Sequence, residues 1–371
     1  MSTTPKKLRV LIVDDSAFMR KVLHAIIAAD PQLEVAGQAK DGHEAVSMAE
    51  SLKPDVITMD INMPHMDGLQ ATEHIMSQNP RPIVVVSSES REGAASTLVA
   101  LELGAIDFVS KPSSGVDLDM KSVSDDLNRK LKIAAKVRVI RTAARAKHHA
   151  ANGHHPIAHP PNANDSGDAA SETNRFPVVV IAASTGGPAS VMRVAARFPA
   201  EFPAAIVLVQ HMPANFTSQY AVQLSEVTEM RVKEAETNET LCPGIFYVCP
   251  GSHHLRISSL GRIVLDGGPR VSGYRPCADL TMETAANWAG AMTVGVVLTG
   301  MGNDASRGAQ AIRAAGGMVI AQDEATSVIF GMPAEAIKTG AVNQILPLEQ
   351  VFSSLEKHVR QLIRLSQAVP R

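Results

Sequence analysis

Short apolar runs recur along residues 8–112, and a stretch with helical periodicity follows each of them. The runs read LRVLIVD, LEVAGQA, DVITMD, PIVVVSS and DFVSK. Strands of this length that alternate with amphipathic helices are typical of α/β proteins, in which helices cover a parallel sheet. The pattern therefore predicts a first domain built on a small parallel α/β sheet.

A second set of apolar runs extends from residue 177 to residue 347. These runs read VVVIAA, AAIVLVQ, MTVGVVLTG and GMVIAQ, and a glycine-rich segment from Pro243 to Gly273 separates the second from the third. The alternation again favours an α/β fold, here with a mostly parallel, doubly wound sheet. We expect hairpins within the glycine-rich segment. The chain thus divides into two α/β domains.

Residues 143–174 differ from both domains in composition. They are largely Ala, His, Pro, Asn and Ser, show no apolar periodicity and contain five of the thirteen histidines. Such a stretch cannot bury a core, so we expect a flexible tether, with a metal-binding tract as the alternative. A basic helix precedes it, either as a surface for acidic partners or as the solvated last helix of the first domain. We place the first domain at 6–128, the linker at 129–175 and the second domain at 176–368.

Charge and cysteine content exclude several classes of protein. The 371 residues carry 35 Lys and Arg against 37 Asp and Glu, so no chain-wide field favours nucleic acid or an anionic membrane surface. Three cysteines without CxxC spacing fit neither a disulfide framework nor a zinc site. No signal peptide is evident, and no apolar run reaches the roughly 18 residues of a membrane span. We expect a cytoplasmic protein with no membrane insertion and no nucleic-acid partner.

Polar residues follow four of the five strands predicted in the first domain. They are Asp14 and Asp15, then Asp60, Ser87 and Lys111. Carboxyl ends of parallel strands share one edge, and carboxylates gathered there repel each other unless a cation such as Mg²⁺ joins them. Asp60 could then act as a nucleophile towards a phosphoryl donor, with Ser87 and Lys111 contacting the phosphoryl oxygens. The alternative is that these acids only cap helices and strand ends.

The segments LIVDDS, ITMDINMPHMDG, VVVSS and FVSKP together resemble the receiver domain of bacterial two-component response regulators. The resemblance implies a flavodoxin-like (βα)5 fold in which Asp60 accepts phosphate from a histidine kinase. It also implies that Mg²⁺ is held by Asp15, Asp60 and the backbone carbonyl of Asn62, with Asp14 assisting. A conformational switch is implied as well, involving Ser87, Phe108 and Lys111.

The second domain begins with a strand and a small-residue turn, VVVIAASTGGPAS, that contains Ser184. A Gly-Gly turn could cradle a phosphate, but the sequence matches neither common phosphate-binding loop. It is close to the G-x-S-x-G turn that presents a serine nucleophile, and such a serine needs a base and an acceptor that orients the base. His211 follows the next apolar strand and Asp304 follows a third, so the three side chains should meet at one sheet edge.

Each member of this candidate triad has a simpler alternative role. Ser184 could be a helix cap, His211 a buried hydrogen-bonding residue and Asp304 a turn former. Rival residues also exist for the base and its partner, namely His253, His254, Asp279 and Asp266. They lie away from the ends of long apolar strands, so we rank them lower. The order Ser, His, Asp differs from that of α/β-hydrolases, and we do not assign that fold.

IAASTGGP, QHMP, VCPGSHH, LTGMGNDAS and FGMPAEA resemble the catalytic domain of the protein-glutamate methylesterases of bacterial chemotaxis, the CheB family. The resemblance implies that Ser184 attacks the γ-methyl ester of a receptor glutamate, that His211 is the general base and that Asp304 orients it. It also points to the Met301 backbone amide as an oxyanion donor and places Thr185 beside the nucleophile. Methyl-accepting chemotaxis receptors are the implied substrates, a chemotaxis histidine kinase is the implied phosphodonor, and no cofactor is implied for the esterase chemistry.

Three features leave alternatives open. Ala182 and Ala305 stand where glycine is expected in the family, and the linker is longer than expected. The resemblance also implies that an unphosphorylated receiver packs over the esterase site, and a long tether would weaken that packing. The competing functions are a receptor glutamine deamidase with the same triad, a DNA-binding response regulator, and a non-catalytic scaffold that serves as a phosphate sink.

Overall fold

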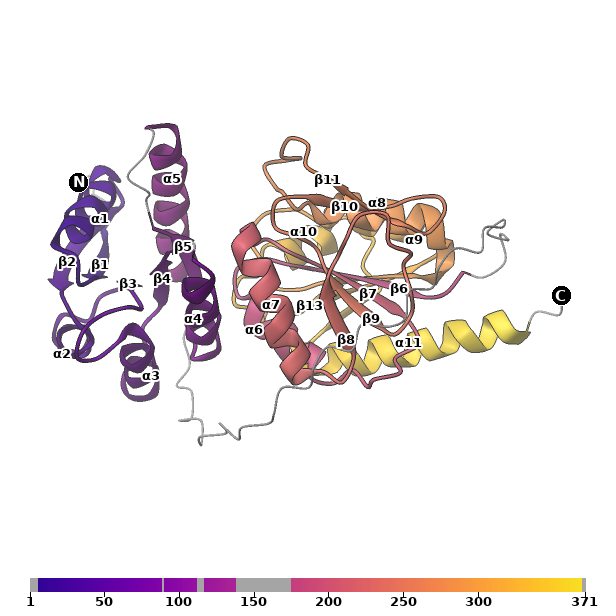
Figure 1. The fold of residues 1–371 in the computed structure, drawn as a ribbon, viewed down its shortest axis with the longest axis horizontal. Coiled ribbons are helices and arrows are strands. Elements are labelled where there is room, and N and C mark those ends of the chain that lie inside the picture. The colour runs from indigo at the N-terminus through magenta and orange to yellow at the C-terminus, as the bar shows by residue number, and fades with distance from the viewer. Residues whose placement is uncertain (1–5, 89, 112–116, 138–174, 369–371) are drawn as a thin grey trace.

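The chain folds into two α/β units, described here from a computed structural model (Figure 1). The structure describes residues 6–88, 90–111, 117–137 and 175–368. The predicted tether, residues 143–174, therefore lies outside the described residues. Of the predicted linker, only residues 129–137 and residue 175 are described. No helix in the described ranges is long and apolar enough to cross a membrane.

The first unit is built on a five-stranded parallel sheet with the order β2-β1-β3-β4-β5. Its strands are β1 (Leu8–Val13), β2 (Leu33–Ala39), β3 (Val56–Met59), β4 (Ile83–Ser87) and β5 (Asp107–Ser110). Its helices are α1 (Ala17–Ala29), α2 (Gly42–Leu52), α3 (Gly68–Gln78), α4 (Arg91–Glu102) and α5 (Asp117–Ala134). All five predicted strands are confirmed.

Alternation along the strands divides the core of this unit into two layers. Val10 and Ile12 of β1 belong to the apolar cluster with α1 and α5, whereas Leu11 and Val13 belong to the cluster with α2, α3 and α4. Successive side chains of a strand point to opposite faces, so helices are needed on both. The helices begin where a side-chain oxygen accepts a hydrogen bond from the first turn, as at Ser16, Asp41, Asp67 and Ser90.

Helix α5 crosses the expected domain boundary between residues 128 and 129. Beyond that point Lys130 lies 3.1 Å from Asp107 of β5, and Lys132 lies 2.7 Å from Asp30 at the end of α1. Both partners belong to the first unit. Residues 129–134 are therefore the continuation of α5 on this unit and do not form a separate linker helix. Lys130 and Lys132 therefore serve as ion-pair partners within the unit.

The second unit is built on a seven-stranded parallel sheet with the order β14-β13-β12-β6-β7-β9-β8. Its strands are β6 (Val178–Ala183), β7 (Ala205–Gln210), β8 (Arg231–Glu234), β9 (Ile245–Val248), β12 (Thr293–Val297), β13 (Met318–Gln322) and β14 (Gln344–Leu346), with β10 (His254–Ile257) and β11 (Ile263–Asp266) as a separate antiparallel hairpin. Its helices are α6 (Gly187–Ala195), α7 (Ala214–Val227), α8 (Ala278–Ala289), the 3-10 helix η1 (Gly290–Met292), α9 (Ser306–Ala314), α10 (Met332–Lys338) and α11 (Leu348–Ala368).

Helices again cover both faces of the second sheet, with α6, α7 and α11 on one and α8, α9 and α10 on the other. The four long apolar runs are its central strands, as predicted. The glycine-rich segment holds the expected hairpin and also β9, a strand of the main sheet that was not predicted. Strand order reverses beside β6, because the chain continues to β7 on one side and later returns to β12 on the other. Ligands of open α/β sheets bind at the carboxyl ends of strands at such a point.

The two units meet along an apolar surface, here called the interdomain seam, formed by α4 and β5 against α6 and α7 (Figure 1). Phe108 of β5 stacks on Phe216 of α7, with ring centroids 4.3 Å apart. One buried apolar cluster contains both rings together with Leu98 of α4. On the other side of β5, Val328 of the second unit packs against the cluster that holds α5. The seam therefore joins the two cores.

Candidate functional site

The three acids predicted at the edge of the first sheet come together in the structure. One carboxylate oxygen from each of Asp14, Asp15 and Asp60 lies within 4.8 Å of the others. Lys111 reaches the same place, with its Nζ 3.0 Å from Asp14 Oδ2 and 2.8 Å from Asp60 Oδ2. Asp14 and Asp60 are buried and Asp15 is exposed, so the group forms an acidic cup open on one side.

Burial shifts the protonation equilibria in this cup. It raises the pKa of Asp60, and the nearby charge of Asp14 adds to the effect, although the ion pair with Lys111 partly opposes it. Burial acts to lower the pKa of Lys111, but its pairing with Asp60 and Asp14 outweighs burial and raises it. The Lys111 ammonium is therefore held beside carboxylates whose negative charge it only partly compensates.

The acidic cup fits a hard divalent cation. Its donors are carboxylate oxygens, which Mg²⁺ prefers, and the buried Asp14 Oδ2 has the Lys111 ammonium 3.0 Å away. Asn62 lies on the loop after β3, two residues beyond Asp60. The first unit thus has an acidic triad that is typical of a Mg²⁺ site.

The two other residues predicted for the switch, Ser87 and Phe108, make contacts with groups other than these carboxylates. The Ser87 hydroxyl donates to the carbonyl oxygens of Ser88 and Gly93, at 3.2 and 3.1 Å, on the side of α4. Phe108 is buried in the interdomain seam, where Lys130 Nζ lies 5.2 Å from its ring centroid. A change at Phe108 would therefore act directly on the contact between the two units.

Ser184 follows β6 on a turn that only small residues permit. Its N–H donates to the carbonyl oxygen of Thr299 at 3.1 Å, which joins this turn to the loop after β12. Gly300 lies so close that a Cβ there would be 2.8 Å from the Ser184 Cβ. Gly186 has a φ of +73°, and a Cβ there would overlap Val328. These glycines keep Ser184 at the edge of the sheet.

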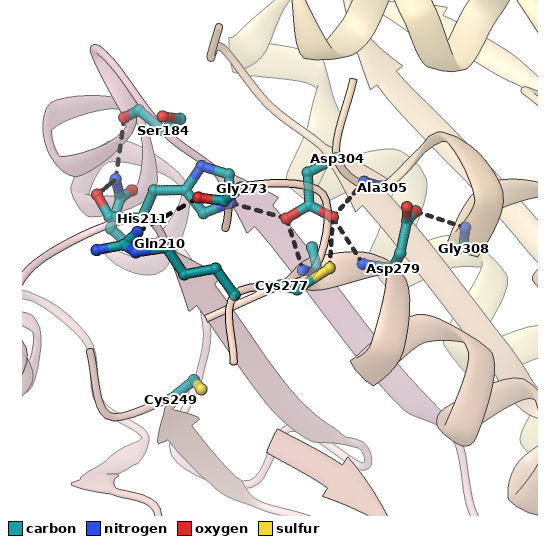
Figure 2. A network of polar contacts seen from close by, with 12 residues as sticks. Ser184, Gln210, His211, Cys249, Gly273, Cys277, Asp279, Asp304, Ala305 and Gly308 are labelled. Carbon is teal, nitrogen blue, oxygen red and sulfur yellow. Dashed lines mark hydrogen bonds and ion pairs between the residues drawn. The ribbon is translucent and has the colours of Figure 1, made fainter. Parts of the chain in front are cut away.

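His211 and Asp304 form the hydrogen-bonded pair that the sequence predicts (Figure 2). His211 Nε2 lies 2.7 Å from Asp304 Oδ2. An ionised carboxylate can only accept, so we assign the proton to Nε2 and leave Nδ1 as the basic nitrogen of the neutral ring. Within the described residues no hydrogen bond joins Ser184 Oγ to the imidazole, and such contacts often tighten only when substrate binds.

The Asp304 carboxylate is almost completely buried and is surrounded by hydrogen-bond donors (Figure 2). Oδ2 accepts from the N–H of Ala278, and Oδ1 accepts from the N–H groups of Asp279 and Ala305, at 2.7 to 3.0 Å. Burial acts to raise the pKa of Asp304, but the bond and charge of His211 and these backbone donors outweigh it and lower the pKa. The carboxylate therefore stays ionised.

Side chains of the first unit reach the immediate neighbours of Ser184. Thr185 Oγ1 donates to Asp107 Oδ2 of β5 at 2.5 Å, and Lys130 also binds Asp107. Arg129 of α5 donates to the Met301 sulfur at 3.1 Å. Thr185, expected beside the nucleophile, and Met301, whose backbone amide is the expected oxyanion donor, are thus both in contact with the other unit.

Comparison with known proteins identifies a family for each of the two units. Residues 179–355 match the family described as CheB methylesterase, and residues 10–121 match the response regulator receiver domain. The chain belongs to the CheB methylesterase family. A protein-glutamate methylesterase/protein-glutamine glutaminase of Pyrococcus abyssi is 43% identical over 375 residues, covering 98% of this chain and 96% of that protein.

Two further comparisons cover the whole chain and its second unit. The protein of the same name from Pyrococcus horikoshii is 44% identical, covering 97% of this chain and 95% of its own. The crystal structure of the Thermotoga maritima CheB methylesterase catalytic domain is 40% identical, with a TM-score of 0.48, covering 49% of this chain and 98% of that domain. Because residues 179–355 match the CheB methylesterase family, the second unit is not the DNA-binding output domain considered as an alternative.

The side chains of the rivals considered for the base and its partner have contacts outside the His211–Asp304 pair. His253 Nδ1 contacts Ser252, and buried His254 Nε2 contacts the carbonyl oxygen of Pro269. Asp266 faces His254 across the hairpin. Asp279 does approach Asp304 through its backbone N–H, but its own carboxylate accepts from Gly308 and Arg307 of the α9 region.

Several residues of this site were not predicted. Gln210 Nε2 donates to the carbonyl oxygens of Ser184 and His211, at 2.9 and 3.3 Å, and so links the first two members of the triad. Its position directly before His211 was the available signal.

The backbone at Ala305 explains why glycine is expected at this position, because this buried residue has a φ of +75°, where glycine is favoured. Ala182 is a buried residue within β6, where a methyl group is accommodated.

We predict that Asp60→Asn stabilises the protein in the absence of divalent cations. Because the folded-state pKa of Asp60 is raised, the cost of its charge grows as pH rises from about 4 and is complete above the folded pKa. At pH 7 the variant should unfold about 4 °C higher, the shift produced by about 1 kcal/mol, and the gain should shrink towards pH 4. Thermal denaturation in EDTA measures this.

Asp15→Asn is the matched control, because Asp15 belongs to the same cup but is exposed. Its unfolding temperature should stay within about 1 °C of the wild type. An Asp60→Asn protein that unfolds at a lower temperature than the wild type at pH 7 would contradict the argument.

Proposed function

We propose that this chain is a protein-glutamate methylesterase and protein-glutamine glutaminase of bacterial chemotaxis, controlled by phosphorylation of its receiver. The observation that carries the proposal is the His211–Asp304 pair, 2.7 Å apart, at the same sheet edge as Ser184. Family membership supports the same activity, since relatives that match almost the whole chain carry that name. Methyl-accepting receptors are the substrates, and a chemotaxis histidine kinase is the phosphodonor.

The first half of the reaction forms an acyl-enzyme. Ser184 Oγ attacks the carbonyl carbon of the glutamate γ-methyl ester, and Nδ1 of His211 takes the hydroxyl proton. Asp304 stabilises the resulting imidazolium and holds the ring in place. The backbone N–H of Met301 donates to the oxyanion. When the tetrahedral intermediate collapses, the imidazolium gives its proton to the leaving oxygen, and methanol departs.

The second half restores the enzyme. Water attacks the acyl carbon while His211 accepts a proton, and the imidazolium then returns that proton to Ser184 Oγ as the glutamate carboxylate leaves. A glutamine side chain enters the same sequence with ammonia as its leaving group. The two activities therefore need only one triad, and no cofactor takes part in either.

Removal of triad members should reduce turnover in a characteristic order. Ser184→Ala or His211→Ala should lower the turnover number by about 10⁶-fold, and Asp304→Asn by about 10⁴-fold, because the three groups act as a unit. Methanol release from methylated receptor membranes measures this. The double variant Ser184→Ala/His211→Ala should be no slower than either single variant, and near-normal turnover in Ser184→Ala would reject the mechanism.

In the receiver, Asp60 is the phosphoryl acceptor. Asp15, Asp60 and the backbone carbonyl of Asn62 would hold Mg²⁺, with Asp14 assisting, and the ion when bound neutralises charge on the phosphoryl group. Lys111 already lies 2.8 Å from Asp60 and can pair with a phosphoryl oxygen. Ser87 would turn from its present acceptors towards the new group, and Phe108 would change its position in response.

Three contacts support control of the esterase by the receiver. Asp107 binds Thr185, Arg129 binds Met301, and Phe108 stacks on Phe216. Together they cover the edge where a receptor segment must reach Ser184. Phosphorylation shifts the population from this closed arrangement to an open one, because it changes the structure at Phe108 and Lys111.

The three free thiols fit a reducing cytoplasm, where the receptors and the histidine kinase would meet the protein.

Phe108→Ala should raise the activity of the unphosphorylated protein. Loss of an aromatic pair worth about 1 kcal/mol, together with lost apolar burial, should increase basal methanol release about three- to tenfold. Phe18→Ala is the control, because Phe18 is an exposed phenylalanine on α1 that lies outside the seam. Equal basal rates in wild type and Phe108→Ala would show that the seam does not restrain the enzyme.

A further inference from the structure

One short segment, Tyr274 to Cys277, contacts both members of the His211–Asp304 pair. The Tyr274 ring lies flat on the imidazole of His211, with centroids 4.5 Å apart and an interplanar angle of 15°. Three residues later, Cys277 Sγ lies 3.3 Å from Asp304 Oδ1 (Figure 2). Neither contact is needed to assign the triad, and neither residue was singled out from the sequence for such a role.

The backbone holds Tyr274 in a fixed position. The N–H groups of Val271 and Tyr274 each donate to the other's carbonyl oxygen, at 3.0 and 2.9 Å. Ser272 and Gly273 between them have positive φ values, as a tight hairpin turn requires. The phenol oxygen reaches the loop after β12, where a Cβ on Gly302 would be 1.8 Å from it. Tyr274 is therefore fixed at both ends and covers one face of the imidazole.

Cys277 is suited to donate a hydrogen bond to Asp304. Its side chain is fully buried, and burial together with the charge of Asp304 raises the pKa of the thiol to about 12. The group is consequently S–H at neutral pH, and an ionised carboxylate is its acceptor. With the backbone N–H groups of Asp279 and Ala305, it gives Oδ1 three donors.

We infer that Tyr274 and Cys277 form a clamp that positions the His211–Asp304 pair, Tyr274 by stacking on the imidazole and Cys277 by donating to the carboxylate. Both are positioning residues that act through the triad. Stacking fixes the ring plane so that Nε2 faces Asp304, and an aromatic face favours the imidazolium that forms during the reaction. The thiol shares the negative charge of Asp304 and so limits how strongly this carboxylate holds the proton of His211. The clamp deepens the proposed function and rests on it.

Opposite effects on His211 follow from the two contacts. Tyr274→Leu removes the aromatic face that favours the imidazolium, so the imidazolium of His211 should form less readily than in the wild type. Cys277→Ala removes one donor from Asp304 and so strengthens the pairing of this carboxylate with the imidazolium, which should form more readily than in the wild type. The other charged groups near the pair are unchanged in both variants; they are Asp279 with its partner Arg307, and Arg129, which lies near Tyr274.

The test is a titration of His211 in the full-length protein with isotope-labelled histidine, followed by NMR, with His211→Gln used to assign the signal. Conservative variants distinguish the loss of each contact from the loss of side-chain volume. Tyr274→Phe keeps the stack and Cys277→Ser keeps a donor, so both should titrate like the wild type. Cys249→Ala is the matched control for a buried thiol, because Cys249 contacts the carbonyl oxygens of Pro250 and His253 instead.

The pH profile of methanol release provides a second readout. Its acidic limb should move with the NMR value in each variant, and Tyr274→Leu should lower kcat about tenfold with little change in KM. Unshifted titration in both Tyr274→Leu and Cys277→Ala would overturn the clamp, as would equal shifts in the conservative variants. If Tyr274→Leu does not fold, Tyr274→Met removes the same aromatic face. A wild-type protein that releases no methanol would reject the proposed function and leave the titration result intact.

Discussion

The buried carboxylate of Asp304 is the constraint on which the esterase site depends. An ionised group with about 1% of its surface exposed is costly unless donors surround it. The start of α8, the left-handed turn at Ala305 and the imidazole of His211 all supply such donors. The same contacts that stabilise the charge therefore place His211 at the sheet edge, so local stability and the capacity for proton transfer have one structural origin.

The second organising feature is the interdomain seam. Apolar side chains of α4, β5, α6 and α7 form one continuous cluster, and polar contacts at Thr185 and Met301 lie beside it. β5 carries both Asp107 and Phe108 and ends next to Lys111, which pairs with Asp60. A change at Asp60, the proposed phosphorylation site, can therefore reach Ser184 through one strand, without passing through the residues between the two units. Control of this kind is a difference in packing, and its strength depends on the area that the two units bury.

Much of the fold followed from the sequence because apolar periodicity reports burial. The five strands of the receiver and the four central strands of the esterase sheet were all visible as apolar runs. Strands β8, β9 and β14 were not, since β8 (Arg231–Glu234) and β14 (Gln344–Leu346) are short, partly polar edge strands and β9 (Ile245–Val248) lies within glycine-rich sequence. Pairing with a neighbour stabilises such strands more than their own composition does.

The residues of the candidate site also divide into those that the sequence predicts and those that it does not. Ser184, His211 and Asp304 could be predicted because the ends of parallel strands converge, and that rule needs no coordinates. Tyr274 and Cys277 could not, because their contacts depend on a turn whose positive φ values do not follow from periodicity. Contacts between the two units, such as Asp107 with Thr185, could not be predicted, because the sequence does not specify which faces of two domains meet.

The measurement that tests the account most directly is methanol release from methylated receptor membranes by the purified protein, with and without a small-molecule phosphodonor and Mg²⁺. The account predicts slow release without the phosphodonor, faster release with it, no acceleration in Asp60→Ala and no release in Ser184→Ala. Release that is equally fast with and without phosphodonor in the wild type would contradict control through the interdomain seam. No release from membranes that a known esterase demethylates would contradict the assignment of the triad.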